Sequence, residues 1–332
     1  MNKKQIVGLI AAAVVFVFVY GSSMLIQSFA GQSQQGGYFN KLLSSMEDPS
    51  VNFPTDPFVG VIPVEGTIQA SSSSSSLLPE EGYNHSKTLK LIDSLEDDSN
   101  NKGILLYVNS PGGGVYESEE LYQRLLKYKE NTQRPVWTYM ANMAASGGYY
   151  ISMASDKVIA NSQTWTGSIG VIISLTNYKE LMDKVGVKSV LFTSGKNKSM
   201  GNGGVDMTEE QAKIFQSLVD EPYENFVNIV AKGRKMSAEK VRPLADGRIY
   251  TAKQALQNNL IDGISGYEEA QNQLEETLEE SVEFYTPSSS ASPFASLFSL
   301  AKQYNRSDAE KLADLMEIKE SGVPMYYAAI GE

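Results

Sequence analysis

The chain has 332 residues, a net charge of −11, one histidine and no cysteine. Its length allows one large domain or two smaller ones around a substantial core. The acidic balance argues against a nucleic-acid-binding protein, which usually presents a basic face. The lack of cysteine excludes disulfides and thiolate metal sites, and a single histidine argues against structural zinc.

An uncharged apolar run, Ile6–Ile26, follows two lysines at the N-terminus. About 20 apolar residues are enough to cross a bilayer as a helix. Lysines before the run and none directly after it predict a single-pass cell-membrane protein, with residues 1–5 in the cytoplasm and the rest outside. Ser28 and Ala30 have a cleavage-like spacing, so removal of this segment as a signal peptide is the open alternative.

Residues 27–56 are rich in Gln, Gly, Ser, Asn and Pro, which is typical of a linker. Residues 57–285 alternate apolar runs with helical patterns, which predicts an α/β domain with a parallel sheet and helices packed outside it. The continuous apolar run Gly103–Val108 is typical of a strand buried on both faces. Further strands are expected at 58–64, 135–140, 157–160, 170–174 and 187–193, with helices at 86–95, 115–129, 144–154 and 178–185.

Ser194–Asp206 is polar and glycine-rich and is expected to be an exposed loop. A long helix is predicted over Met207–Lys232, where Thr208 and Gln211 have the spacing of a capping box. Shorter elements follow, as helices at 237–245 and 251–257 and a strand at 248–250, and the last elements are Gly266–Glu279 and Val282–Tyr285. Residues 286–332 form a C-terminal extension that contains the apolar segment Val323–Ile330.

Two glycine-rich turns carry the candidate chemistry. Ser110–Gly114 joins a strand to a helix, so its free amides lie at the positive helix end. Ser146 stands at a predicted helix start between small residues, where the helix dipole favours negative charge. The amides of Gly113 and Gly147 could together form an oxyanion hole. The structural alternatives are a tight strand–helix turn and an N-capping serine.

A serine nucleophile needs a base. His85 follows a serine-rich loop and is interpreted as a surface or packing residue. The base would then be a lysine, made partly neutral by burial. Lys196 and Lys198 are both candidates by position. Ser168 could orient the lysine amine, and its alternative interpretation is a turn before a strand.

Several motifs occur in an order that resembles the bacterial signal peptide peptidase A family, particularly its short, single-repeat Gram-positive form. The likeness runs from Pro57 to Tyr267 and is specific because the motifs are numerous and ordered. The matching segments are Gly66–Ile68, Val108–Ser118, Met143–Ser152, Thr166–Val171, Ser194–Lys198 and Ala245–Arg248.

The resemblance implies the fold of Clp protease and crotonase, a superhelix of repeated ββα units, preceded here by a transmembrane helix. It identifies Ser146 as the nucleophile and Lys198, rather than its neighbouring lysine, as the general base. It also identifies Ser168 as the residue that holds the lysine amine, and places Gly113 and Gly147 at the oxyanion positions. No cofactor or metal is implied.

The family's biology implies a membrane-tethered serine endopeptidase that degrades cleaved signal peptides and misfolded secreted proteins. It implies a homo-oligomeric ring, for which an octamer is the candidate size, with the Ser/Lys dyad shared between subunits. The alternatives are a related Ser/Lys protease acting on a stomatin-like partner, a crotonase-type acyl-CoA enzyme and an inactive peptide-binding scaffold. The membrane anchor and Lys198 argue against the crotonase alternative.

The apolar tail suggests a further hypothesis. An extended peptide can bind a protease groove through backbone hydrogen bonds, with alternate side chains in pockets. Val323–Ile330 is therefore expected to occupy the substrate groove of its own or a neighbouring subunit, where it could be trimmed. The alternative is a terminal strand packed for stability.

Overall fold

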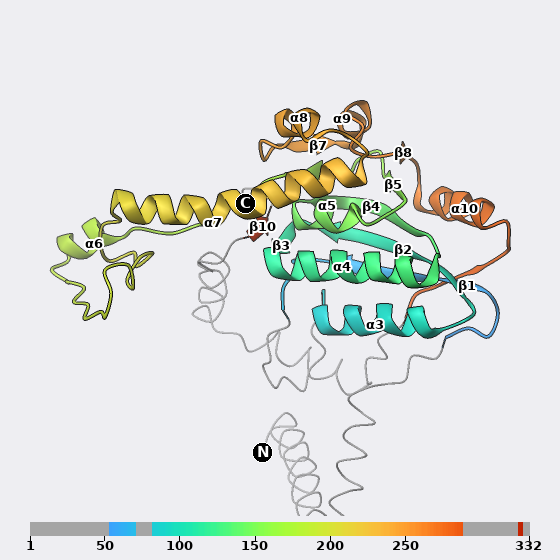
Figure 1. Cartoon of the computed structure of the whole chain (residues 1–332), viewed down its shortest axis with the longest axis horizontal. Coiled ribbons are helices and arrows are strands. Elements are labelled where there is room, and N and C mark those ends of the chain that lie inside the picture. Colours follow the sequence, from blue (N-terminus) through green and yellow to red (C-terminus); the bar gives the residue numbers. More distant parts are fainter. Residues whose placement is uncertain (1–52, 71–81, 288–324, 328–332) are drawn as a thin grey trace, which may run out of the picture. The chain divides into compact units, whose positions relative to one another are not determined.

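The computed structural model describes residues 53–70, 82–287 and 325–327 (Figure 1). The chain divides into two units, Met1–Asn52 and Phe53–Glu332, and every described residue belongs to the second. The expected membrane span at 6–26 lies outside the described residues. Within the described ranges, no helix is both long and apolar enough to cross a membrane.

The second unit contains an eight-stranded sheet in the order β7-β6-β4-β2-β1-β9, with β5 beside β4 and β8 beside β5. Its central strands β1, β2 and β4 are parallel neighbours, and β5 and β6 both pair in parallel with β4. Only β7 runs antiparallel within this sheet, against β6. The strands are β1 (Phe58–Glu65), β2 (Asn101–Ser110), β4 (Val136–Ala145), β5 (Lys157–Ala160), β6 (Trp165–Gly167), β7 (Ile249–Thr251), β8 (Gly263–Ile264) and β9 (Glu283–Tyr285). The predicted α/β sheet with mostly parallel strands is confirmed.

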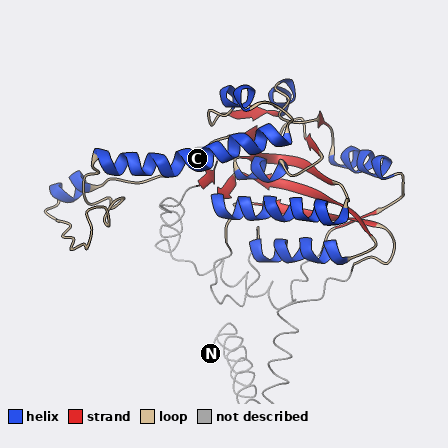
Figure 2. Cartoon of the chain, in the orientation of Figure 1, coloured by secondary structure: helices blue, strands red, loops and turns tan. Residues whose placement is uncertain are grey.

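Helices cover both faces of this sheet (Figure 2). On one face lie α3 (His85–Asp97), α4 (Val115–Thr132) and α5 (Gly147–Ser152), and on the other lies α10 (Tyr267–Leu278). The remaining helices are α6 (Lys179–Lys184), α7 (Glu209–Gly233), α8 (Ala238–Val241), the short 3₁₀ helix η1 (Arg242–Leu244) and α9 (Ala252–Gln257). The predicted capping box at the start of α7 is confirmed, because the side chains of Thr208 and Gln211 each bond the other's backbone.

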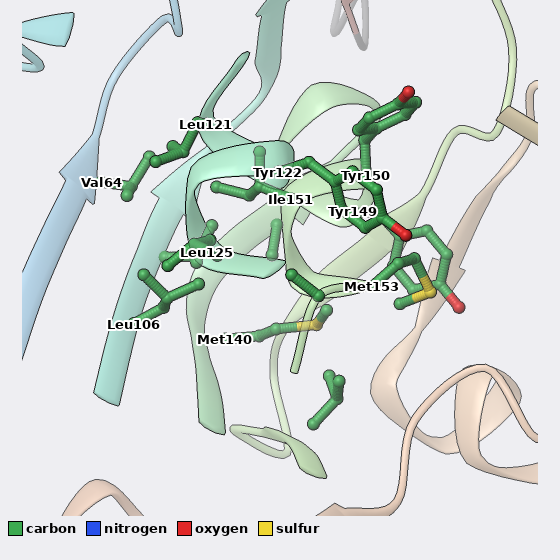
Figure 3. Packing of buried hydrophobic residues seen from close by; sticks show 14 of the residues in the cluster. Val64, Leu106, Leu121, Tyr122, Leu125, Met140, Tyr149, Tyr150, Ile151 and Met153 are labelled. Atoms are coloured by element: carbon green, nitrogen blue, oxygen red, sulfur yellow. The ribbon is translucent and has the colours of Figure 1, made fainter. Parts of the chain in front are cut away.

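The alternation of side chains along each strand creates two cores. Leu105 of β2 packs on the α10 side with Leu274. Its neighbour Leu106 points the other way, toward Leu121 and Leu125 of α4 (Figure 3). Because both faces are covered, β2 needs an apolar residue at nearly every position, and this explains the continuous run seen in the sequence.

The structure departs from the predicted boundaries of the strand before Ser146 and of the helix after it. β4 continues to Ala145, beyond the predicted end at Met140, and the helix predicted from Ala144 begins only at Gly147. The physical reason is a short strand that the sequence analysis missed, since Met143–Ala145 pairs with Trp165–Gly167 of β6. Ser146 therefore occupies the turn between strand and helix.

The strands predicted at 170–174 and 187–193 are wrong, because the structure forms neither. Val171 of the first segment packs against the main core, but most apolar side chains of the second segment are exposed. Phe192 is 96% exposed, and Val190 and Val187 are at least half exposed. An apolar β-rich pattern alone does not make a strand when no neighbouring strand is in place to accept its backbone hydrogen bonds.

Candidate active site

Ser146 has a strained backbone at the turn from β4 to α5. Its φ of 53° and ψ of −116° lie in a region that L-residues seldom adopt. Two hydrogen bonds fix the turn. The Ser146 amide donates to the Gly167 carbonyl at 2.8 Å, and the Ser146 carbonyl accepts from the Tyr150 amide at 2.8 Å. Strain of this kind persists where the surroundings enforce it, and it clusters at functional sites.

The hydroxyl of Ser146 is fully buried, and its Oγ has no hydrogen-bond partner among the described residues. It does not cap the helix that it precedes, so the interpretation of Ser146 as a simple N-capping serine is wrong. A buried hydroxyl without a partner costs about 1–3 kcal/mol. The fold therefore keeps the Ser146 hydroxyl buried although this costs stability. Its Oγ atom remains available to interact with another group.

The two glycine-rich segments meet at this serine. Gly112–Gly114 forms the short strand β3, beside Ile68. A Cβ atom on Gly112 would lie 2.8 Å from the Gly147 amide nitrogen, and one on Gly147 would lie 3.1 Å from the Gly113 amide nitrogen. Only residues without side chains allow this approach. The structure therefore brings together the two backbone segments from which the oxyanion hole was predicted.

Ser168 also lies at this turn. It follows Gly167, whose register partner is Ala145, so Ser146 and Ser168 directly follow two paired strand ends. Ser168 is 7% exposed, and it too has a positive φ, of 50°. Its amide donates to the Arg248 carbonyl at 2.7 Å, which ties this turn to the Ala245–Arg248 motif.

Neither candidate lysine contacts Ser146. The Lys196 Nζ atom pairs with Glu210 at 2.8 Å, and hydrogen bonding to Lys196 holds the pKa of Glu210 below its usual range. Lys198 is exposed and makes no side-chain hydrogen bond or ion pair with the residues that the structure describes. The segment between α6 and α7 that carries both lysines lies beyond the N-terminal end of α7, away from α5 (Figure 1).

His85 is a packing residue, as expected. It is 6% exposed and lies at the start of α3. Its Nδ1 atom is 2.6 Å from the Tyr83 hydroxyl, and its Nε2 atom is 2.9 Å from a carboxylate oxygen of Glu120. Both ring nitrogens are therefore occupied, and neither bonds Ser146.

The C-terminal tail reaches the glycine strand. Met325–Tyr327 forms β10, which pairs antiparallel with β3 so that Tyr326 lies opposite Gly113 (Figure 1). A Cβ atom on Gly112 would lie only 2.0 Å from the Tyr326 carbonyl oxygen. These three residues pair with the glycine strand of their own chain, and the hypothesis that the tail occupies the substrate groove stays a prediction. Competition with substrate and trimming of the tail stay predictions.

Tyr326 fills an aromatic pocket beside β3. Its side chain is 1% exposed, stacks on Tyr150 at 4.7 Å between ring centroids, and lies 4.8 Å from the Phe226 ring. Its hydroxyl donates to the Pro222 carbonyl at 3.1 Å. Burial raises the pKa of Tyr326 and of Tyr150, whose own hydroxyl donates to Glu119. This pocket could not be predicted from the sequence, because Tyr150, Pro222 and Phe226 come together only in the folded chain.

Comparison with known proteins agrees with this geometry. Residues 128–281 match peptidase family S49, and residues 81–166 match the Clp protease family. The first range contains Ser146, Gly147, Ser168 and Lys198, and the second contains Gly113 and Ser146. The match to Clp protease supports the predicted Clp protease/crotonase-like fold.

Individual relatives fit the same families. The chain is 46% identical over 211 residues to an Enterococcus faecium protein described as a candidate signal peptide peptidase SppA, an alignment covering 64% of this chain and 61% of that protein. It is 33% identical over 243 residues to protease 4 of Haemophilus influenzae, covering 72% and 38%. It is 30% identical over 183 residues to the chloroplastic serine protease SPPA of Arabidopsis thaliana, covering 55% and 27%. The alignments span less than two thirds of each relative's length.

Proposed function

Because this chain is a member of peptidase family S49, we propose that it is a serine endopeptidase in which Ser146 is the nucleophile and Lys198 the general base. The observation that carries the proposal is the Ser146 hydroxyl itself. It is buried, it has no hydrogen-bond partner among the described residues, and it stands on a strained turn directly before Gly147, which lies close to the Gly113 amide. Such a turn resembles the strand-to-helix elbow that presents serine nucleophiles in other hydrolases.

The chemistry follows from these positions. A neutral lysine amine takes the Ser146 proton as Oγ attacks the peptide carbonyl carbon. The carbonyl oxygen becomes an oxyanion, which the amides of Gly113 and Gly147 stabilise. The lysine then returns the proton to the leaving amine, and water hydrolyses the acyl-enzyme by the same route. The Ser168 hydroxyl orients the lysine amine, which matches the place of Ser168 beside Ser146.

The lysine comes from a neighbouring subunit of a homo-oligomeric ring. Ser146 lacks a base within the described chain, while Lys198 lies on a segment that extends away from α5. This segment also presents unusually apolar side chains to solvent. The side chains of Phe192, Val190 and Val185 are 96%, 71% and 66% exposed. Exposed apolar patches of this kind mark protein–protein contacts.

The substrates are extended apolar peptides, with released signal peptides as the main class and misfolded secreted proteins as a second. The pocket that takes Tyr326 next to β3 supports this choice, because it accepts a large apolar side chain from a strand paired with the glycines. The apolar run at 6–26 supports a single-pass anchor with the catalytic domain outside the cytoplasm.

Three variants of the full-length protein test the dyad. Ser146→Ala and Lys198→Ala should each abolish cleavage of a synthetic signal peptide, and Lys196→Ala, the matched control from the same loop, should keep it. A fluorophosphonate probe should label wild-type Ser146 and leave Ser146→Ala unlabelled. Full activity in Lys198→Ala, or no labelling of folded wild-type protein, would overturn the proposal. The second result would favour an inactive peptide-binding scaffold.

Subunit sharing has its own test. Inactive Ser146→Ala and Lys198→Ala chains, mixed under conditions that exchange subunits, should regain part of the wild-type activity, since one chain supplies the serine and the other the lysine. Native mass spectrometry would show that mixed assemblies formed. Mixed assemblies without activity would mean that each site takes both residues from one chain.

A further inference from the structure

A second buried hydroxyl near Ser146 has no hydrogen-bond partner among the residues that the structure describes. Ser118 of α4 is fully buried, and its Oγ makes no hydrogen bond in the described part of the chain. The other buried side-chain atoms left unpartnered there are the Ser146 Oγ and one carboxylate oxygen of Glu96. Buried polar groups are almost always satisfied, so each exception needs an explanation.

The Ser118 hydroxyl lies beside the predicted oxyanion hole. A Cβ atom on Gly147 would be 2.6 Å from the Ser118 Oγ and 3.1 Å from the Gly113 amide nitrogen. Covalent geometry places the Gly147 amide nitrogen about 2.5 Å from the same point. The Ser118 hydroxyl and the amide nitrogens of Gly113 and Gly147 therefore lie within a few ångströms of one another, beside the Gly147 Cα.

The helix explains why this serine points to the glycines. α4 begins at Val115, directly after β3, and its N-cap is Gly114. Side chains on a helix tilt toward its N-terminus, so a residue in the first turns leans back over the strand that precedes it. Ser118 is placed to do this.

The neighbours of Ser118 are occupied elsewhere. Glu117 accepts a hydrogen bond from the Ala70 amide at 3.3 Å, Glu119 accepts from the Tyr150 hydroxyl, and Glu120 bonds His85 at 2.9 Å. Three carboxylates of this stretch therefore have donors, while the Ser118 hydroxyl among them has no acceptor in the part of the chain that the structure describes. An acceptor that appears only when substrate reacts would explain this difference.

We propose that the Ser118 hydroxyl is a third donor of the oxyanion hole. Its O–H donates to the negatively charged oxygen of the tetrahedral intermediate, together with the amides of Gly113 and Gly147. The hydroxyl keeps its proton, and no bond is made or broken at Ser118. Hydrogen bonds to a charged acceptor are roughly twice as strong as neutral ones, and an interaction made only in the transition state raises kcat. The inference rests on the proposed protease function.

Ser118→Ala tests it with two readouts on the full chain. Cleavage of an apolar fluorogenic peptide should lose about 10- to 100-fold in kcat with little change in KM, because the donor acts on the transition state. The free energy of unfolding should not fall, because the hydroxyl has no partner to lose. Loss of stability with unchanged kcat would mean that Ser118 is structural and would overturn the inference.

Ser152→Ala is the matched control. Ser152 is also fully buried, on α5, but its Oγ donates to the Gly148 carbonyl at 2.7 Å. Its replacement should lower stability by about 1 kcal/mol and leave kcat close to wild type. Ser118→Ala is therefore expected to lower kcat without lowering stability, and Ser152→Ala to lower stability without lowering kcat.

Ser118→Cys separates hydrogen bonding from packing, since a thiol roughly fills the space but donates weakly. It should lose kcat nearly as far as Ser118→Ala, and each variant should weaken binding of a peptide aldehyde, which forms a tetrahedral adduct on Ser146. Full activity in both variants, with Ser146→Ala inactive, would overturn only the Ser118 inference. Activity in Ser146→Ala would instead overturn the protease proposal itself.

Discussion

Gly147 shows how little space surrounds the reacting serine. A Cβ atom there would lie 2.6 Å from the Ser118 Oγ and 3.1 Å from the Gly113 amide nitrogen, and both distances are shorter than ordinary contacts. Gly147→Ala should therefore push the two glycine segments apart and misplace the oxyanion donors. We expect kcat to fall about 100-fold or more, as when an oxyanion donor is lost, with the protein still folded. Steady-state kinetics with circular dichroism would measure both quantities.

Gly263→Ala is the control for this change. No atom lies within 4 Å of a Cβ atom built on Gly263, which is in β8. The same substitution should leave kcat close to wild type. Equal activity in Gly147→Ala and Gly263→Ala would show that the contact at Gly147 has no part in catalysis.

The positions of Ser146, Gly113 and Gly147 could be predicted because their signal is local. Glycines after a strand and before a helix imply close backbone approach whatever the rest of the fold does. Ser118 could not be identified from the sequence, because serines are common in helices. Only the structure shows that its buried hydroxyl has no partner among the described residues. The separation of Lys198 from Ser146 within one chain was also invisible to residue-level reasoning, and only the family resemblance suggested it.

Among the elements, the end of α7 is tied to the sheet through a partly buried ion pair, in which the Arg234 side chain is 9% exposed and that of Asp262 is 32% exposed. Arg234, directly after α7, bonds Asp262 at 2.7 and 2.8 Å. Asp262 also accepts from the Val158 amide of β5 at 2.8 Å. Burial raises the pKa of Asp262, but the bonds to Arg234 and Val158 outweigh it and hold that pKa below its usual value.

This pair predicts how stability depends on pH. Because the pKa of Asp262 is lower in the folded state, its stabilisation is complete above the unfolded-state pKa of about 3.9 and is lost as the pH falls through the folded-state pKa. Asp262→Asn should lower the free energy of unfolding at pH 7 by on the order of 1–3 kcal/mol. The difference from wild type should shrink below about pH 4. Urea unfolding at several pH values would measure it.

Glu224→Gln provides the comparison. Glu224 also makes two bonds with an arginine, Arg242, but both side chains are nearly half exposed. Solvent screens exposed pairs, so little change is expected. A larger loss in Glu224→Gln than in Asp262→Asn would contradict the importance given to burial.

The order of the elements was more predictable than their ends. The strand at 157–160 and the capping box of the long helix were predicted correctly from local patterns. The end of β4 was not, because it depends on pairing with Trp165–Gly167, a segment too short to recognise alone. The segment at 187–193 has an apolar pattern that predicts a strand, yet the single chain offers it no neighbour.

At the scale of the whole molecule, Met325–Tyr327 of the C-terminal tail pairs with the glycine strand of the candidate active site. Deleting residues 323–332 should raise kcat/KM on short peptides several-fold, because an attached segment competes at a high effective concentration. Tyr326→Ala should act in the same direction by emptying the aromatic pocket. Intact-mass analysis should find a trimmed tail in active protein and a full-length tail in Ser146→Ala.

The competing interpretation makes different predictions. If β10 is only a packed terminal strand, its deletion should lower the melting temperature and leave peptide kinetics unchanged. A tail that remains full length in active and inactive protein alike, with unaltered kinetics after deletion, would decide for that interpretation.

The distance that separates the segment carrying Lys198 from α5 has a consequence for control of the enzyme. If the proposed sharing of the dyad between subunits holds, a lone chain has the serine without its base and is inactive. Assembly is governed by mass action, so activity per chain rises with the amount of protein present. Under this proposal, newly made chains are inactive until their concentration allows them to assemble, and dilution makes them inactive again. Under this proposal, the abundance of the protein sets its activity in addition to any competition from the C-terminal tail.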